Sequence, residues 1–110
     1  MKYSVQSESG LVMKYKIKFL PSANQDINDL ADILTPYPNK ARRLFQEMEQ
    51  KIESLKDNPL MYPEYQADPR YRRMNLEGHA LFYDVDVINH EIRVYRIIYA
   101  KRDIAKLLIM

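Results

Sequence analysis

The chain has 110 residues, and it contains no cysteine and only two glycines, Gly10 and Gly78. Without a thiol there is no disulfide, no thiolate nucleophile and no cysteine-ligated metal. Two isolated glycines cannot form the glycine-rich loop that cradles a phosphate. The two histidines, His79 and His90, lie apart in the sequence, which argues against a structural zinc site. We therefore expect no metal and no cofactor.

Long apolar runs and a strong net charge are also missing. No segment approaches the ~20 apolar residues that a membrane-spanning helix needs, and residues 1–12 contain no apolar core of a signal peptide. The net charge of +2 is too small to indicate nucleic-acid binding by itself. The hydrophobic fraction of 46% and the charged fraction of 29% are ordinary for a globular domain. We expect one cytoplasmic domain with no membrane partner.

The N-terminal part divides into a leader and the start of the domain. Residues 1–3 recur as residues 13–15 (both MKY), and periodicity begins only at the second copy. We therefore expect residues 1–13 to be a peripheral extension and residues 14–110 to form a single domain. From residue 14 to residue 19, aromatic and aliphatic side chains alternate with lysines. This alternation predicts a strand with one buried face and one lysine-bearing face.

Two amphipathic helices are predicted next. Apolar residues recur at helical spacing over residues 23–34 and again over residues 41–55. Ser22 and Gln25 form a capping-box pattern at the start of the first helix, and the Asn-Pro pair at residues 58–59 stops the second. Because few residues separate the helices, we expect an antiparallel helix hairpin.

The C-terminal half predicts strands. Residues 71–76, 79–85 and 92–99 are strand candidates joined by short connections, which favours an antiparallel meander. Apolar residues within 104–108 predict a short terminal helix. The predicted fold class is α+β: an antiparallel-rich, four-stranded twisted sheet with the helix hairpin on one face. We expect the other face to be open.

Cationic and aromatic side chains gather on the predicted second and fourth strands. In a meander these strands flank the third, so the group can converge at one end of the sheet, where arginines grip phosphates and a tyrosine stacks or transfers a proton. A structural interpretation stands beside this: Arg96 pairs with an acid such as Asp84, and Tyr95 and Tyr99 pack under a helix. The candidate site residues are Arg72, Arg73, Arg96, Tyr99, Lys101 and Arg102.

Three segments carry a resemblance to a known family. Residues 71–76 (YRRMNL), 80–85 (ALFYDV) and 92–103 (IRVYRIIYAKRD) resemble the C-terminal signature of the RelE/ParE superfamily, the toxins of type II toxin–antitoxin systems. The resemblance extends over about residues 14–108. It implies the RelE/ParE-like fold, an antitoxin partner that neutralises the toxin, and growth arrest of the plasmid-stabilisation type.

The resemblance implies two alternative targets. RelE-like members cut mRNA on the ribosome, whereas ParE-like members act on DNA gyrase. Ala80 stands where the nucleases usually carry arginine, and Ile98 stands where YoeB-like nucleases carry histidine, so DNA gyrase is favoured. Arg73 and Tyr99, however, match the catalytic arginine and the terminal tyrosine of YoeB-like enzymes. The question of enzymatic activity stays open, and a non-toxic antitoxin-binding protein is a further alternative.

Catalysis by Tyr99 places a demand on its surroundings. A tyrosine has an ordinary pKa near ~10, so it needs cationic help to act as a base at neutral pH. On this hypothesis, Arg73 or Lys101 must lower that pKa. The resemblance gives no reason for His79 or His90 to lie beside Tyr99. We therefore expect a docking surface rather than an autonomous catalytic centre.

Overall fold

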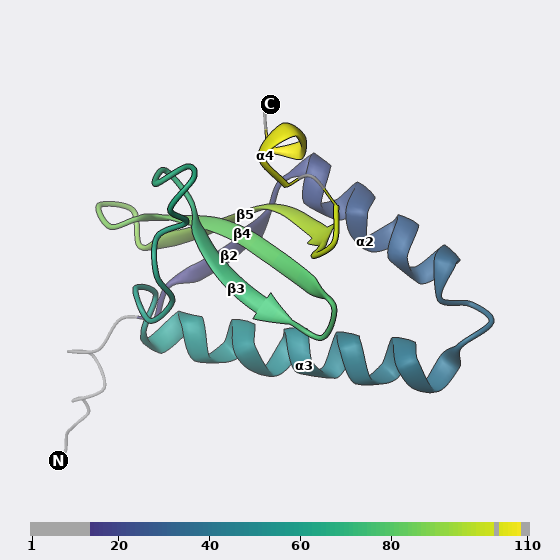
Figure 1. Cartoon of the computed structure of the whole chain (residues 1–110). Coiled ribbons are helices and arrows are strands. Elements are labelled where there is room, and N and C mark those ends of the chain that lie inside the picture. The colour runs from purple at the N-terminus through teal and green to yellow at the C-terminus, as the bar shows by residue number, and fades with distance from the viewer. Residues whose placement is uncertain (1–13, 103, 109–110) are drawn as a thin grey trace, which may run out of the picture.

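The computed structural model describes residues 14–102 and 104–108 (Figure 1). The predicted extension over residues 1–13 lies outside the described residues. None of the helices within the described part is long and apolar enough to cross a bilayer. The elements, in chain order, are β2 (Lys16–Phe19), α2 (Pro21–Ile33), α3 (Pro38–Asp57), β3 (Arg72–Leu76), β4 (His79–Asp86), β5 (Glu91–Tyr99) and α4 (Ile104–Leu107).

The sheet has the strand order β2-β5-β4-β3. β3, β4 and β5 form the predicted antiparallel meander, and β2 pairs in parallel with β5, with Ile17 opposite Ile92. Gly78 turns the chain between β3 and β4 with φ of 70°, a left-handed conformation that suits glycine. The predicted α+β fold with a four-stranded, antiparallel-rich sheet is confirmed.

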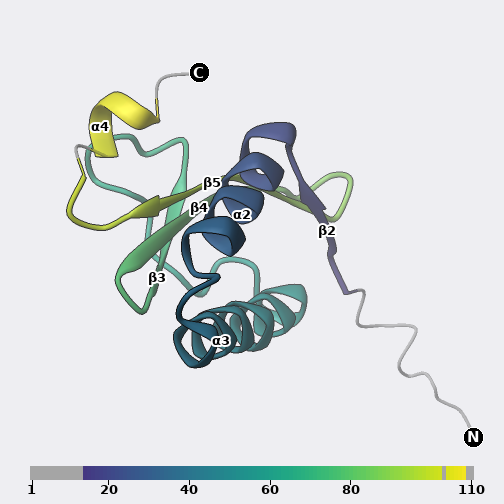
Figure 2. The same ribbon diagram turned by 90° about the vertical axis from the view of Figure 1, so that its right-hand side faces the viewer.

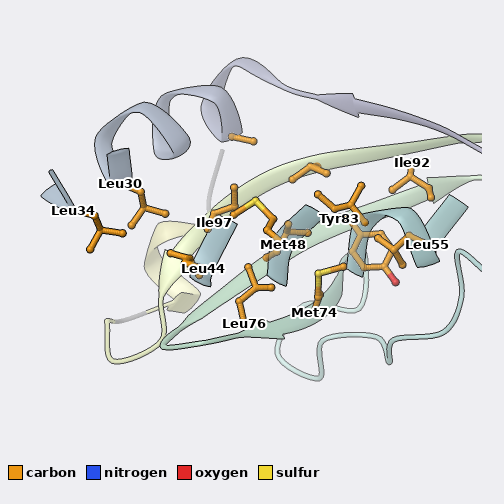
Figure 3. Packing of buried hydrophobic residues seen from close by; sticks show 14 residues of the cluster. Leu30, Leu34, Leu44, Met48, Leu55, Met74, Leu76, Tyr83, Ile92 and Ile97 are labelled. Carbon is orange, nitrogen blue, oxygen red and sulfur yellow. The ribbon is translucent and has the colours of Figure 1, made fainter. Parts of the chain in front are cut away.

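Both long helices pack on one face of the sheet, as the hairpin prediction requires (Figures 1 and 2). Their apolar stripes meet the inward side chains of β3, β4 and β5 (Figure 3), and Ile17 and Phe19 of β2 pack against the same cluster, which makes this the main core. Leu55 of α3, Met74 of β3 and Tyr83 of β4 have no exposed surface at all. Neither helix could bury its stripe alone, so the hairpin and the sheet stabilise each other.

α2 begins differently from the prediction. Its first residue is Pro21, and the N-cap residue Leu20 makes no side-chain capping bond. Ser22 lies inside the helix, and Gln25 donates to Asp29 Oδ1 at 2.8 Å. The predicted capping box is therefore wrong. Proline suits the first helical position because its missing N–H would have no helical partner there.

The side chains of α2 instead satisfy the outer edge of β5. β2 ends at Phe19, so the last part of β5 has no neighbouring strand on that side. Ser22 Oγ donates to the carbonyl oxygen of Tyr95 at 2.7 Å, and the backbone N–H of Ile97 donates to Asp26 Oδ2 at 2.9 Å. A helix side chain thus takes the place of a strand at each of these backbone groups.

The second face of the sheet is covered in large part, and the expectation of an open face was wrong. Ala80, Phe82 and Ile98 form a second apolar cluster on this side, packed against Tyr71 and the terminal helix. Tyr65 lies edge-on to Phe82, with ring centroids 5.1 Å apart. These strands carry apolar side chains on both faces, so the second face also needs cover. Two segments provide it: the loop that precedes β3, and the terminal helix α4.

Candidate functional site

The six candidate residues do not converge at one point. Arg72 donates from Nη1 to the carbonyl oxygen of Tyr62 at 2.7 Å, and its Nη2 lies 4.0 Å from Glu64. The same loop forms a bridge to β3, pairing Glu64 with Arg72. Arg72 therefore secures the loop against the edge strand.

Arg73 points to the other face of β3. Its guanidinium lies over the rings of Tyr65 and Phe82, at 5.9 and 5.8 Å from the ring centroids. Its Nε donates to Asn75 Oδ1 at 2.8 Å. Stacking of a guanidinium on aromatic faces is a favourable cation–π arrangement. Arg73 thus lies over the second apolar cluster, and no carboxylate of the described residues pairs with it.

Arg96 forms an ion pair, with an acid different from the one expected. Its Nε and Nη2 donate to the Asp26 carboxylate at 2.7 and 3.2 Å, and its Nη1 donates to the carbonyl oxygen of Leu107 at 2.7 Å. The side chains of Arg96 and Asp26 are only 21% and 12% exposed. Arg96 therefore connects β5 to α2 and α4, and the structural interpretation of this residue holds with Asp26 in place of Asp84.

Asp84 has another partner on the same strand pair. Arg93 donates to it from Nε and Nη2 at 2.9 and 3.0 Å, and the hydroxyl of Tyr95 donates to its Oδ2 at 3.0 Å. Burial raises the pKa of Tyr95, and its hydrogen bond to the Asp84 carboxylate raises it further. The hydrogen bonds to Asp84 raise the pKa of Arg93. Tyr95 thus stays a neutral donor near neutral pH, which is a structural role.

Tyr99 is the last residue of β5, and Lys101 and Arg102 follow it in an exposed turn. Tyr99 is 45% exposed, so it does not pack under a helix. Its ring lies beside that of His79, with centroids 5.5 Å apart and an interplanar angle of 58°. The two residues are directly opposite in the β4–β5 register. A histidine therefore lies beside Tyr99, although the family resemblance gave no reason for one to be there.

A groove of about 450 Å³ opens next to this pair, between α2 and the end of β5. Its apolar side includes Ile33, which is 66% exposed. Lys40 and Arg102 also line it, and the described residues give neither of them an acidic partner. The lining residues are Asp26, Asp29, Leu30, Ile33, Leu34, Lys40, His79, Arg96, Ile97, Ile98, Tyr99, Arg102 and Leu107.

Of the residues that line this groove, only Arg96, Tyr99 and Arg102 were among the candidates, and sequence reasoning missed Ile33, Lys40 and His79 in particular. The signal for His79 was present, because the short connection between β4 and β5 pairs the start of β4 with the end of β5. Lys40 comes from the far end of the helix hairpin, and no local pattern places it there. The groove's apolar residues are bordered by the cations Lys40 and Arg102 and by the acid Asp29, while Asp26 is paired with Arg96, so the charge of the rim is net positive and suits an amphipathic, acidic partner. No cluster of three or more potential metal ligands occurs in residues 14–102 and 104–108.

Comparison with known sequences decides the family. The family described as "ParE toxin of type II toxin-antitoxin system, parDE" matches residues 17–104. This chain belongs to the ParE toxin family. It is therefore a toxin of the type II toxin–antitoxin class within the wider RelE/ParE superfamily. No curated protein sequence matches the chain.

Solved structures that share the fold of this ParE family member include two toxin–antitoxin systems. One is the chromosomal ParDE system from P. aeruginosa, at 20% identity and a TM-score of 0.65, covering 80% of this chain and 98% of that chain. The other is the RelBE2 toxin–antitoxin complex from Mycobacterium tuberculosis, at 16% identity and a TM-score of 0.59, covering 82% of this chain and 95% of that chain. At these identities the likeness establishes the fold.

Proposed function

We propose that this ParE family member arrests growth in the cytoplasm by binding DNA gyrase, and that an antitoxin neutralises it. The observation that carries the proposal is that the guanidinium of Arg96 is already bonded within the protein. A catalytic centre around Tyr99 needs a cation that stabilises developing negative charge. The guanidinium of Arg96 is committed to Asp26 and to the carbonyl oxygen of Leu107, which supports a docking role for this end of the sheet.

The position of Arg73 supports the same conclusion. In the register of the sheet, Arg73 lies opposite Phe82 of β4, whereas Tyr99 lies opposite His79, three residues away along the same strand. At ~3.4 Å per residue, the backbones of Arg73 and Tyr99 are about 10 Å apart in the direction of β4. The guanidinium of Arg73 also rests over Phe82 and Tyr65. Arg73 therefore does not supply a cation beside Tyr99.

For the antitoxin, the groove beside α2 offers a docking surface. An amphipathic helix can place its apolar face on Ile33 and its neighbours and its acidic side chains near Lys40 and Arg102. Opposite charges at the rim of an interface accelerate association and select the partner. Binding there would also cover Tyr99, so one partner would block the surface that we assign to the target.

Two measurements test the proposed target. Induced expression of the chain without antitoxin should stop bacterial growth, and the purified chain should inhibit supercoiling by purified gyrase. Arg102→Glu should weaken that inhibition. Arg42→Glu is the matched control, because Arg42 is exposed on α3 and, among the described residues, its side chain bonds only Asn39. Unchanged growth would favour a non-toxic antitoxin-binding protein, and arrest with unaffected supercoiling would contradict the gyrase proposal.

A second candidate function, ribosome-dependent cleavage of mRNA, is favoured by the contact between His79 and Tyr99. An imidazole beside a phenol provides two proton-transfer groups next to the cations Lys40 and Arg102. Primer extension on mRNA from induced cells tests this alternative. Cuts within codons that disappear in both His79→Ala and Tyr99→Phe, with supercoiling untouched, would move the chain to the nuclease branch.

A further inference from the structure

The outer edge of β2 has backbone groups that no described residue pairs. The N–H groups of Lys16 and Leu20 point inward and donate to the carbonyl oxygens of His90 and Val94 at 2.9 and 3.0 Å. In a strand the intervening residues point their backbone groups the opposite way. Ile17 therefore presents its N–H and carbonyl at the outer edge, and Phe19 presents its N–H there, while the carbonyl oxygen of Phe19 accepts a hydrogen bond from Asn24 Nδ2 at 3.5 Å. Figure 2 shows β2 as the last strand of the sheet.

The other sheet edge differs, since the loop before β3 covers it. The backbone N–H of Arg73 donates to the carbonyl oxygen of Pro63 at 3.1 Å, and Glu64 forms a bridge with Arg72. Lys51 Nζ donates to the carbonyl oxygen of Asn75 at 2.7 Å. Of the two edges in the described part of the chain, β2 is thus the one left ready to pair with another strand.

The two sides of the β2 edge have different chemistry. On one side Lys16 and Lys18 are exposed, and the described residues give them no ion pair. On the other side a groove of about 370 Å³ lies between Phe19 and α3. Phe45 and Ile52 are among its apolar lining residues. A strand added here would alternate acidic side chains toward the lysines with apolar side chains toward α3.

We propose that the edge of β2 binds an extended segment of the antitoxin as a fifth strand, with acidic and apolar residues in alternation. The inference rests on the proposed function in that the partner is an antitoxin, and it assigns that partner a second contact distinct from the groove at Tyr99. Ile17 and Phe19 supply the backbone hydrogen bonds, while Lys16, Lys18 and the apolar groove select the side chains.

The lysines argue against a second copy of this chain as the occupant. Two β2 edges brought together would place Lys16 and Lys18 of one copy beside those of the other, and like charges in cross-strand contact are destabilising. Lysines on an edge strand in this way prevent self-pairing. An acidic partner strand converts the same repulsion into attraction.

Amide hydrogen exchange of the full chain, alone and with its antitoxin, tests the proposal residue by residue. The amides of Ile17 and Phe19 should exchange rapidly in the free chain and become protected in the complex, whereas the inward amide of Lys16 should be protected in both. A complex that forms while Ile17 and Phe19 stay unprotected overturns the proposal and leaves the antitoxin partnership standing. No complex at all is a failure of the proposed function.

Two further outcomes assign the edge to another occupant and overturn the proposal. Protection of Ile17 and Phe19 in the dilute free chain would mean that residues 1–13 already pair with β2. Protection that rises with the concentration of the chain alone would mean pairing between copies. Dilution series of the exchange experiment separate these cases from binding of the antitoxin.

A charge reversal provides an independent readout in affinity. Lys18→Glu should weaken antitoxin binding several-fold, up to about tenfold, because it replaces an attraction with a repulsion at the strand. The fold should persist, since residue 18 faces solvent and its register neighbour is Arg93. Arg42→Glu changes the net charge equally and should leave the affinity unchanged. Equal affinities of wild type and Lys18→Glu would contradict the proposed charge selection.

Discussion

Asp26 and Arg96 connect the first helix to the centre of the sheet. The carboxylate of Asp26 accepts two hydrogen bonds from the guanidinium of Arg96, at 2.7 and 3.2 Å, and a third from the backbone N–H of Ile97 at 2.9 Å. These groups are mostly buried. A charge in such a place is tolerable only while its partner is present.

Removing one partner should therefore destabilise the fold strongly. We expect Asp26→Ala and Arg96→Ala each to lower the free energy of unfolding by about 3 kcal/mol, because each leaves a buried charge uncompensated. Urea denaturation measures the effect. Glu53→Ala removes an exposed ion pair with Lys56 on α3 and should leave the unfolding midpoint unchanged. Equal midpoints for all three variants would contradict this role of Asp26.

Two apolar residues on the helix hairpin should separate stability from binding. Leu55 is fully buried, so Leu55→Ala should cost about 3 kcal/mol of unfolding free energy through lost burial and the cavity left behind. Ile33 is 66% exposed and lines the groove, so Ile33→Ala should change stability little and weaken antitoxin binding. Thermal unfolding and titration calorimetry measure the two effects. An Ile33→Ala variant that binds normally would remove this residue from the docking surface.

Charges at the groove should govern antitoxin affinity. We expect Lys40→Glu combined with Arg102→Glu to weaken binding by about tenfold or more, since two rim attractions become repulsions. The charge-conserving exchange Lys40→Arg with Arg102→Lys is the control and should bind nearly as the wild type does. Affinity should also fall with rising salt. Binding that responds neither to the reversal nor to salt would contradict an electrostatic contribution.

Tyr83 should make the chain sensitive to alkali. Burial raises the pKa of its phenol to about 12, from an ordinary value of 10.0. The unfolded chain then releases this proton before the folded chain does, so its contribution to stability declines as the pH rises from about 10 to about 12. The Tyr83→Phe variant should therefore lose less stability than the wild type as the pH rises.

Near neutral pH, Tyr83→Phe should lower the free energy of unfolding by about 1 kcal/mol, because the hydrogen bond to the Pro59 carbonyl is lost. Denaturant titrations from pH 7 to pH 12 measure both effects, and identical pH profiles would contradict the assignment.

Sequence patterns determined the local elements well. Alternation around Ile17 and the apolar stripe up to Leu55 predicted a strand and a long helix, and both are present. The short turn at Gly78 predicted the β3–β4 hairpin. These features depend on neighbours in the sequence, since strand and helix periodicities and turn lengths are set by local backbone geometry.

Long-range pairing was decided by the tertiary structure. The sequence identified Arg96 as a candidate for an ion pair, but not that its partner is Asp26, 70 residues away. Nor did it place Lys40 in the groove beside Tyr99, because the hairpin of α2 and α3 folds over the sheet to bring them together.

The register of the sheet decided the remaining features. β4 and β5 pair through a shift between Phe82 and Tyr83, so Phe82 lies opposite Arg96, Tyr83 lies opposite Val94, and one residue of β5 stays unpaired. The sequence by itself determined the elements and the family to which they belong. Only the tertiary structure decided which cations are bound internally and which face solvent, because an ion pair depends on where two distant segments meet in space.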